Sequence, residues 1–262
     1  MNNSIGAIIF LTKDQTGTLM LEPILFEPAA AWLSQTLADS GVSRFLVVCH
    51  EDDRSAASVC FPAQAEFVTT GDENAFEKLA LFLEQSTDSV LVFTSPVFLT
   101  DAGAQRLLSL PELPRDMMGT GAYRVDPTAL KQALSDGAFG DFEEALQHTG
   151  QEFCEGADWG VRSVYKLESR LDLMDVQAVA RKLTVARAVR RGVRVIDPDA
   201  VYIGPNVQIG SGTVLLPGTI LRGSTVIGAN CVIGGSAFIT SSVPANTRVA
   251  VAPPELNYSM KK

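Results

Sequence analysis

The sequence predicts an α/β protein in three parts: an α/β domain over residues 1–166, a helical arm over 167–192 and a short left-handed parallel β-helix over 193–262. Three observations support this division. Apolar strands alternate with amphipathic helices in the first part, one long helical pattern follows, and a six-residue period occupies the last part.

Strand and helix patterns alternate through the first part of the chain. Several strands are apolar without interruption, which is typical of parallel strands covered by helices on both faces. The predicted strands cover residues 5–11, 44–49, 65–69 and 89–94, and the predicted helices cover 29–41, 73–86 and 127–136. Together these elements predict an α/β sandwich.

A long helical pattern begins at Leu167 and closes near Gly192, a residue suited to a helix end. It predicts a rigid arm between two domains. Basic residues are frequent in its second half, and we interpret them as a solvated helix face; an anion or partner site is the less favoured alternative.

A six-residue period follows the arm. Written in sixes from Val195, one column of small or apolar residues runs from Val195 to Val249, and a second runs two positions later from Asp197 to Val251. The second column is aliphatic at Ile203, Ile209, Leu215, Leu221, Ile227, Ile233 and Ile239. This period predicts a β-helix of about three coils with the aliphatic column inside. So short a prism buries little core, so we expect a homotrimer.

Composition narrows the class of protein. A net charge of −9 disfavours nucleic acid as a partner, and no apolar run is long enough to span a membrane. The N-terminus shows no signal-peptide pattern, and the four cysteines are scattered without metal-binding spacing. We therefore expect a cytoplasmic protein with neither a membrane nor a nucleic-acid partner.

Residues 193–235 carry a more specific pattern, with I-D-P, Y-I-G, P-G-T and I-G-x-N-C-x-I-G in fixed register. This pattern resembles the start of the β-helix in the bifunctional N-acetylglucosamine-1-phosphate uridyltransferase / glucosamine-1-phosphate acetyltransferase family. The order of α/β domain, helical arm and β-helix matches as well. The resemblance implies that the first part is a Rossmann-like, nucleotidyltransferase-type domain.

In that family a glycine-rich loop after the first strand binds the nucleotide phosphates, and its arginine and a nearby lysine neutralise charge. The resemblance implies nucleotide contacts from two loops, through Leu11, Thr12, Gly17, Thr18, Thr69, Thr70 and Gly71. The first loop departs from the pattern. Leu19 stands at the arginine position, Asp14 replaces a glycine, and no Lys or Arg occurs between Asp14 and Ser43.

The sugar and metal positions also differ. The segment G-T-G-A-Y-R-V resembles the strand that faces the sugar, which implies sugar contacts from Thr120 and Gly121. Ser95 stands where the family has an aspartate that holds Mg²⁺, and a neutral hydroxyl is a poor ligand for that ion. The second metal ligand aligns near Glu168, a weak candidate. We expect Mg²⁺ only if the site is active, and otherwise no cofactor.

The remaining candidates are few. The acetyltransferase half of the family needs a histidine in later coils, whereas His50 and His148 both precede the β-helix, so we expect no acetyltransferase activity. The segment C-H-E-D-D-R, residues 49–54, gathers a thiol, an imidazole and carboxylates. A metal or nucleophile site is one interpretation, and we favour a strand end followed by a solvated loop.

Three hypotheses follow. The first is a uridyltransferase-like protein of UDP-N-acetylglucosamine metabolism with an eroded site, which acts as a binding or regulatory relative. Its partners would be itself as a homotrimer, a nucleotide sugar and a full-length homologue. The second is an active nucleotidyltransferase that makes a UDP-sugar from a sugar 1-phosphate and UTP, and the third is a purely structural trimerisation module.

Overall fold

The computed structural model describes residues 5–15, 17–86, 89–109, 119–135, 142–152 and 163–250. The chain divides into two compact units, Met1–Val176 and Gln177–Lys262. The first unit is the α/β domain, and the second is the β-helix with the second half of the arm.

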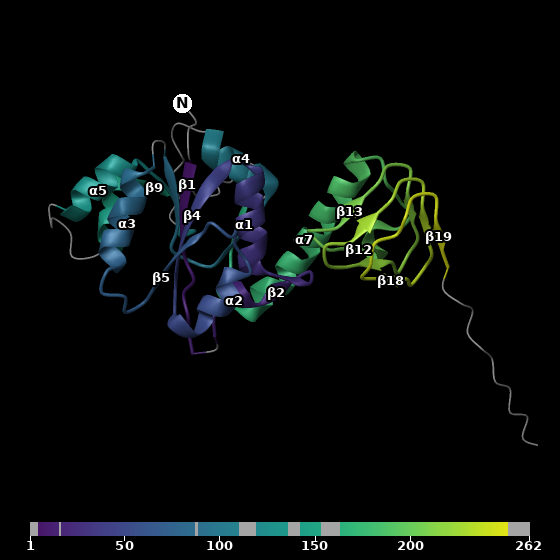
Figure 1. The fold of residues 1–262 in the computed structure, drawn as a ribbon, viewed down its shortest axis with the longest axis horizontal. Helices are drawn as coiled ribbons and strands as arrows, with labels where there is room; N and C mark the ends of the chain where they lie inside the picture. The colour runs from purple at the N-terminus through teal and green to yellow at the C-terminus, as the bar shows by residue number, and fades with distance from the viewer. Residues whose placement is uncertain are drawn as a thin grey trace, which may run out of the picture. The chain divides into compact units, whose positions relative to one another are not determined.

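A six-stranded sheet forms the centre of the first unit (Figure 1). Its order is β5 (Glu66–Thr69), β4 (Val42–Cys49), β1 (Ile5–Phe10), β6 (Val90–Phe93), β8 (Ala122–Val125) and β9 (Gly150–Glu152). The first four strands run parallel, as the uninterrupted apolar runs predict, while β8 is antiparallel to both of its neighbours. The sheet is therefore mixed rather than wholly parallel.

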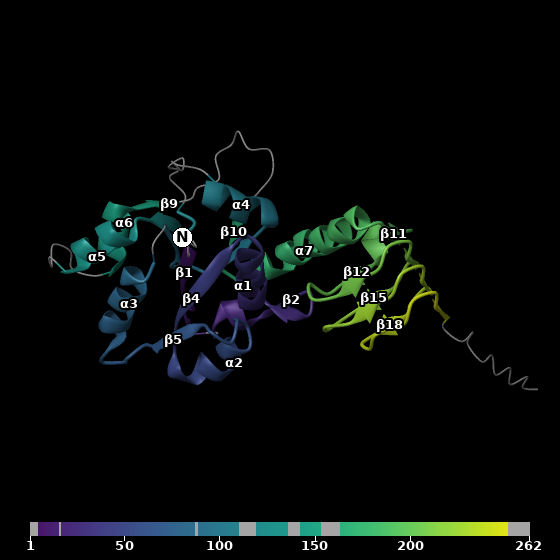
Figure 2. The ribbon, with the colours of Figure 1, turned by 45° about the horizontal axis from the view of Figure 1, so that its top comes forward.

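Helices cover both faces of this sheet, as Figures 1 and 2 show. On one face lie α3 (Ala75–Glu84), α5 (Pro127–Ser135) and α6 (Phe142–Thr149); on the other lie α1 (Ala29–Asp39) and α4 (Asp101–Ser109). Phe82, Leu130 and Leu146 pack on the side chains of Ile8 and Val92 in one buried cluster. The fold class predicted for this part of the chain is confirmed.

Shorter elements connect the sheet to the loops at its edge. They are η1 (Leu19–Leu21), the hairpin β2 (Pro23–Ile24) and β3 (Glu27–Pro28), η2 (Glu51–Asp53), α2 (Arg54–Ser58), and the antiparallel pair β7 (Val97–Leu99) and β10 (Val164–Lys166). The pairing of β7 with β10 returns the chain to the end of β6 just before the arm begins.

The predicted arm is helix α7 (Arg170–Arg190). Ser169 caps its start: the Ser169 Oγ accepts from the Leu171 amide at 3.2 Å, and the Asp172 carboxylate accepts from the Ser169 amide at 2.8 Å. At the other end, Gly192 has a φ of +85° and its amide bonds to Val189, while the Val193 amide bonds to Ala188. This is a Schellman cap, which explains why the helix stops at the predicted glycine.

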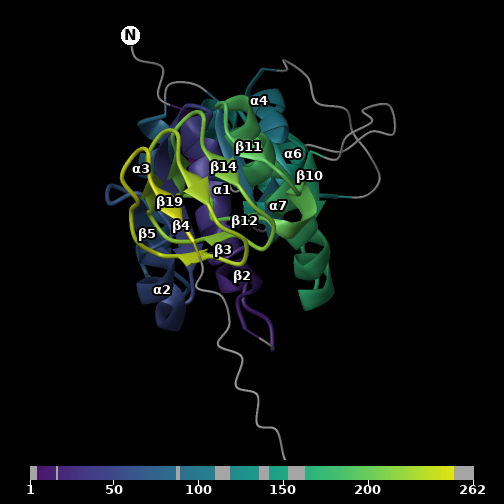
Figure 3. The same cartoon turned by 90° about the vertical axis from the view of Figure 1, so that its right-hand side faces the viewer.

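The second unit is the hexapeptide β-helix (Figure 3). Its strands are β11 (Arg194–Val195), β12 (Tyr202–Ile203), β13 (Gln208–Ile209), β14 (Val214–Leu215), β15 (Ile220–Leu221), β16 (Val226–Ile227), β17 (Val232–Ile233), β18 (Phe238–Ile239) and β19 (Arg248–Val249). Tyr202 pairs with Ile220 and Ile220 with Phe238, so each coil takes 18 residues, or three hexads. The predicted architecture is confirmed.

Both predicted columns lie inside the prism over its middle part. The aliphatic column is buried from Ile203 to Ile233, and the small column is buried from Val201 to Ala237. Buried threonines of the small column have hydrogen-bond partners: the Thr213 hydroxyl, for example, donates to the Gly228 carbonyl at 2.8 Å.

The register at both ends of the prism differs from the prediction. Val195 pairs with Leu215 rather than with Thr213, because η4 (Pro198–Ala200) adds two residues before the next strand. Val249 pairs with Ile233 after a coil that is two residues shorter. Val195 and Val249 therefore align with the aliphatic column, not with the small column in which the six-residue count placed them.

Among the described residues, no helix combines the length and the apolar character needed to cross a membrane.

Candidate functional site

The carboxyl ends of β1, β4, β5 and β6 meet at one edge of the sheet, and β8 begins there because it runs in the opposite direction. In open α/β sheets, ligands bind beyond the carboxyl ends of the strands. The binding point lies where the connections that leave two neighbouring strands run to opposite sides of the sheet. Here that point lies between β1 and β6, since β4 and β5 lie on one side of β1 and β6 on the other. The structure brings three predicted groups to this edge: Leu11 and Thr12 after β1, Thr69, Thr70 and Gly71 at β5, and Thr120 and Gly121 before β8.

The loop after β1 is closed on itself. The Asp14 amide donates to the Gly17 carbonyl at 3.1 Å, and the Gly17 amide donates to the Asp14 carbonyl at 3.3 Å. Leu11 is buried and its amide bonds to Val48 of β4. A phosphate-binding loop offers free backbone amides to its ligand, whereas the Gly17 amide is already bonded within the chain.

A turn with three consecutive acids faces this loop from the end of β4. We call Glu51–Asp53, the η2 turn, the acidic turn. The Thr18 hydroxyl donates to Asp53 Oδ2 at 2.5 Å, and Lys13 Nζ lies 3.3 Å from Asp52 Oδ2. The favoured interpretation of this segment as a solvated loop is therefore incomplete: His50, Glu51 and Asp52 are exposed, yet two of the acids bind the loop after β1.

Cys49, just before the acidic turn, does not have the character of a nucleophile. Burial raises the pKa of its thiol, and the negative charge of Asp53 raises that pKa further. The reactive form of a cysteine is the thiolate, which both effects disfavour.

The loop after β5 keeps neutral polar groups at the edge. The Thr70 amide bonds to the Cys49 carbonyl at 2.9 Å, and Thr70 and Gly71 are exposed. Asp72 follows, and its carboxylate accepts from the Asn74 amide and from Lys78. The hydrogen bond from Lys78 is the largest of the effects that lower the pKa of Asp72.

Thr120 and Gly121 lie next to the end of β6. The Gly121 carbonyl accepts from the Thr94 amide at 2.8 Å, and the Thr120 hydroxyl accepts from the Ala122 amide. Ser95, at the position of the family's metal-binding aspartate, packs against Gly121. Thr94 and Ser95 are thus part of this edge, and sequence reasoning had not proposed Thr94.

Glu168 lies beside the same segment. Lys166 pairs with Val97, and the Leu167 amide bonds to the Pro96 carbonyl at 2.8 Å, so Glu168 directly follows the residue that bonds to Pro96. Its carboxylate lies 2.9 Å from Lys166 Nζ and is exposed. Within the described ranges, no group of three or more His, Cys, Asp or Glu side chains could hold a metal ion. A neutral serine and a glutamate that pairs with lysine do not fit Mg²⁺.

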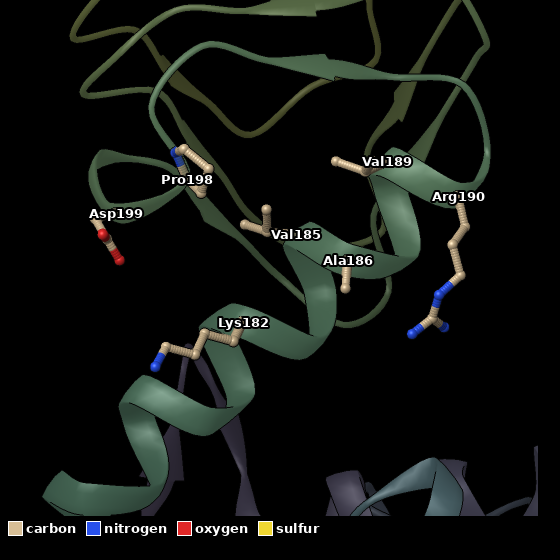
Figure 4. Close-up of a pocket in the computed structure, with 7 residues that line it drawn as sticks. All are labelled: Lys182, Val185, Ala186, Val189, Arg190, Pro198 and Asp199. Carbon is tan, nitrogen blue, oxygen red and sulfur yellow. The ribbon is translucent and has the colours of Figure 1, made fainter.

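A groove of about 420 Å³ lies elsewhere, in the second unit. Figure 4 shows its seven lining residues: Lys182, Val185, Ala186, Val189 and Arg190 of α7, and Pro198 and Asp199 of η4. Asp199 is paired with Arg181, whose Nη2 lies 2.8 Å from its carboxylate. None of the residues named for a nucleotide, a sugar or a metal lines this groove, but Lys182 and Arg190 belong to the basic half of the arm, for which an anion or partner site was the less favoured alternative.

Comparisons with known proteins agree with the sequence pattern. The family described as "Bacterial transferase hexapeptide (six repeats)" matches residues 206–241. "Bifunctional protein GlmU" of Exiguobacterium sibiricum is 35% identical over 123 residues, covering 44% of this chain and 26% of that protein. The GlmU of Caldanaerobacter subterraneus is 35% identical over 107 residues, covering 37% of this chain and 23% of that protein.

The chain thus spans about a quarter of the length of the curated relatives it matches. A solved structure of 4-diphosphocytidyl-2C-methyl-D-erythritolsynthase from Anaerococcus prevotii superposes with a TM-score of 0.46 and 11% identity, covering 69% of this chain and all of that one. The resemblance to the bifunctional family is confirmed over the part of the chain that aligns.

Proposed function

We propose that this chain binds a nucleotide sugar of the UDP-N-acetylglucosamine class without transferring a nucleotidyl group. It would be an eroded relative of the uridyltransferases and act in binding or regulation. One observation carries this proposal: the sheet edge keeps neutral threonines and glycines, while Ser95 and a lysine-paired Glu168 occupy the positions that resemble the metal site.

The proposed contacts divide between the two ends of the ligand. Leu11, Thr12, Gly17 and Thr18 of the first loop and Thr69, Thr70 and Gly71 of the second would contact the nucleotide, and Thr120 and Gly121 would contact the sugar. Threonine hydroxyls and backbone amides can select a uracil and a sugar by hydrogen bonds without a cation. Binding of this kind does not need Mg²⁺.

Calorimetric titration with UDP-N-acetylglucosamine and with UTP, each with and without Mg²⁺, tests the proposal. We expect the nucleotide sugar to bind with an affinity that Mg²⁺ leaves unchanged. Thr70→Val should weaken it about tenfold by removing a hydroxyl at the edge, while Thr128→Val, exposed on α5, should not. No heat with either ligand would overturn the proposal.

The proposed assembly is a homotrimer formed through the β-helix. Tyr202, Ile220 and Phe238 stack in register on the outside of one face, and 41% of Tyr202 and 60% of Phe238 are exposed. An apolar column of this kind on a soluble surface favours a protein partner. A full-length homologue with the same hexapeptide face would be a second partner, detectable as mixed trimers after co-expression.

A further inference from the structure

The contact between the loop after β1 and the acidic turn joins residues far apart in sequence. Thr18 is only 7% exposed, and its hydroxyl meets Asp53, 35 positions later. On the other side of the loop, Lys13 meets Asp52. The two contacts flank the segment in which Asp14 and Gly17 bond to each other.

These contacts use the groups that a phosphate would need. Lys13 is the only Lys or Arg among the first 43 residues, so the loop has no second cation of its own. A hydroxyl, an ammonium and a backbone amide are typical phosphate ligands. Here the hydroxyl and the ammonium are bound by carboxylates, and the amide by a carbonyl.

An ordinary surface ion pair is the simpler explanation for one of the two contacts. Lys13 and Asp52 lie at the surface, with 36% and 71% of their side chains exposed, and a pair of that kind contributes little to stability. It does not explain the bond from the buried Thr18 hydroxyl to Asp53, nor why two consecutive carboxylates bind the same loop. Three adjacent acids would also repel an approaching polyphosphate.

We infer that the acidic turn is an internal anion that takes the place of the terminal phosphates in the proposed nucleotide site. Asp52 and Asp53 hold the loop closed and exclude free pyrophosphate and the terminal phosphates of a triphosphate, which carry more negative charge than the doubly esterified diphosphate of a nucleotide sugar. This inference rests on the proposed function for the identity of the site. It assigns the acidic turn a role in regulation: neutralising the turn opens the loop to polyanions.

Inorganic pyrophosphate is the probe for this contact, because it requires no nucleotide or sugar pocket. We compare the wild type with Asp52→Asn/Asp53→Asn, which keeps the side-chain shapes. The control is Glu77→Gln/Asp175→Asn, which removes two charges from exposed positions on α3 and α7. We expect pyrophosphate to bind the first variant at least about tenfold more tightly than the wild type or the control. Equal affinity in all three proteins would overturn the inference.

Hydrogen exchange of the loop provides a second readout that needs no ligand. The Gly17 amide should exchange several-fold faster in Asp52→Asn/Asp53→Asn than in the control. Thr18→Val removes the hydroxyl that donates to Asp53 and keeps both carboxylates. It should speed exchange of the Gly17 amide without raising the affinity for pyrophosphate. Unchanged exchange in both variants would overturn the inference.

The outcomes separate this inference from the proposed function. If the wild type fails to bind UDP-N-acetylglucosamine while Asp52→Asn/Asp53→Asn gains pyrophosphate affinity, the proposed function fails and the internal anion stands. If the wild type binds UDP-N-acetylglucosamine and Asp52→Asn/Asp53→Asn gains no pyrophosphate affinity, the proposed function stands and the internal anion fails.

Discussion

Ser95 and Gly121 are in direct contact where β6 ends and β8 begins: a Cβ added to Gly121 would come within 2.5 Å of Ser95 Oγ. Gly121 also has a φ of +70°. Its carbonyl accepts from both the amide and the hydroxyl of Thr94. The two strand ends are therefore held together by a glycine that leaves room for the serine, at the position where the family resemblance places an aspartate.

Replacing Gly121 by alanine should destabilise the protein by about 2–4 kcal/mol, because the left-handed backbone and the clash with Ser95 add together. Gly41→Ala is the matched control, since Gly41 has a φ of +103° and no atom within 4 Å of its added Cβ. That variant should lose only about 1 kcal/mol. Chemical denaturation measures both values, and equal losses would show that the contact with Ser95 contributes nothing.

Glu168→Ala distinguishes the eroded site from a working one. We expect unchanged affinity for the nucleotide sugar and a change in unfolding free energy within about 0.5 kcal/mol, because the pair with Lys166 is exposed. An active nucleotidyltransferase would instead release pyrophosphate from UTP and a sugar 1-phosphate in a Mg²⁺-dependent reaction. Such release in the wild type, abolished by Glu168→Ala, would establish the rival function.

The cap of α7 makes stability depend on pH through Asp172. Its carboxylate accepts from the Glu168 amide, the main cause of its lowered pKa, and from Ser169. A depressed pKa in the folded state gives stabilisation that is present above the ordinary value of about 3.9 and is lost as pH falls through the folded value. Asp172→Asn should therefore be less stable than the wild type near neutral pH.

Denaturation at several pH values measures this difference, which should shrink as the pH falls from about 6 to about 3. Ser169→Ala, which removes the other half of the cap, should cost about 1 kcal/mol. Asp175→Asn, an exposed carboxylate on the same helix, is the control. A difference that does not change with pH would contradict this account of the Asp172 cap.

The β-helix could be predicted from the sequence because its period is local. Between Ile203 and Ile239 every sixth residue is aliphatic, and no other part of the chain is needed to identify the pattern. The changes of register at Val195 and Val249 could not be predicted from the count. They depend on a 3-10 turn and a shortened coil, which the hexapeptide period does not encode.

The site could be predicted only in part, for a similar reason. Strand ends are visible in sequence, so Thr12 and Thr70, which follow predicted parallel strands, could be expected at one edge. Gly121 precedes its strand and reaches this edge only because β8 is antiparallel, so only the family resemblance pointed to it. The contact of Thr18 with Asp53 joins two loops through the pairing of β1 with β4. No local pattern marks it, and the segment that holds the acids at residues 51–53 was interpreted as a solvated loop in preference to a metal or nucleophile site.

Phe238→Lys tests the proposed trimer. Phe238 ends the outer column with Tyr202 and Ile220, so a lysine there places a charge in an interface that would otherwise bury an aromatic ring. Light scattering after size exclusion should show a trimer for the wild type and a shift to monomers for the variant. Gln208→Lys, an outward residue of β13 on another face, should leave the trimer intact. Circular dichroism must show the same fold in both variants. If both variants stay trimeric, the subunits do not meet through this column. If the wild type is monomeric, the homotrimer is wrong and the exposed Phe238 side chain would bind a different protein.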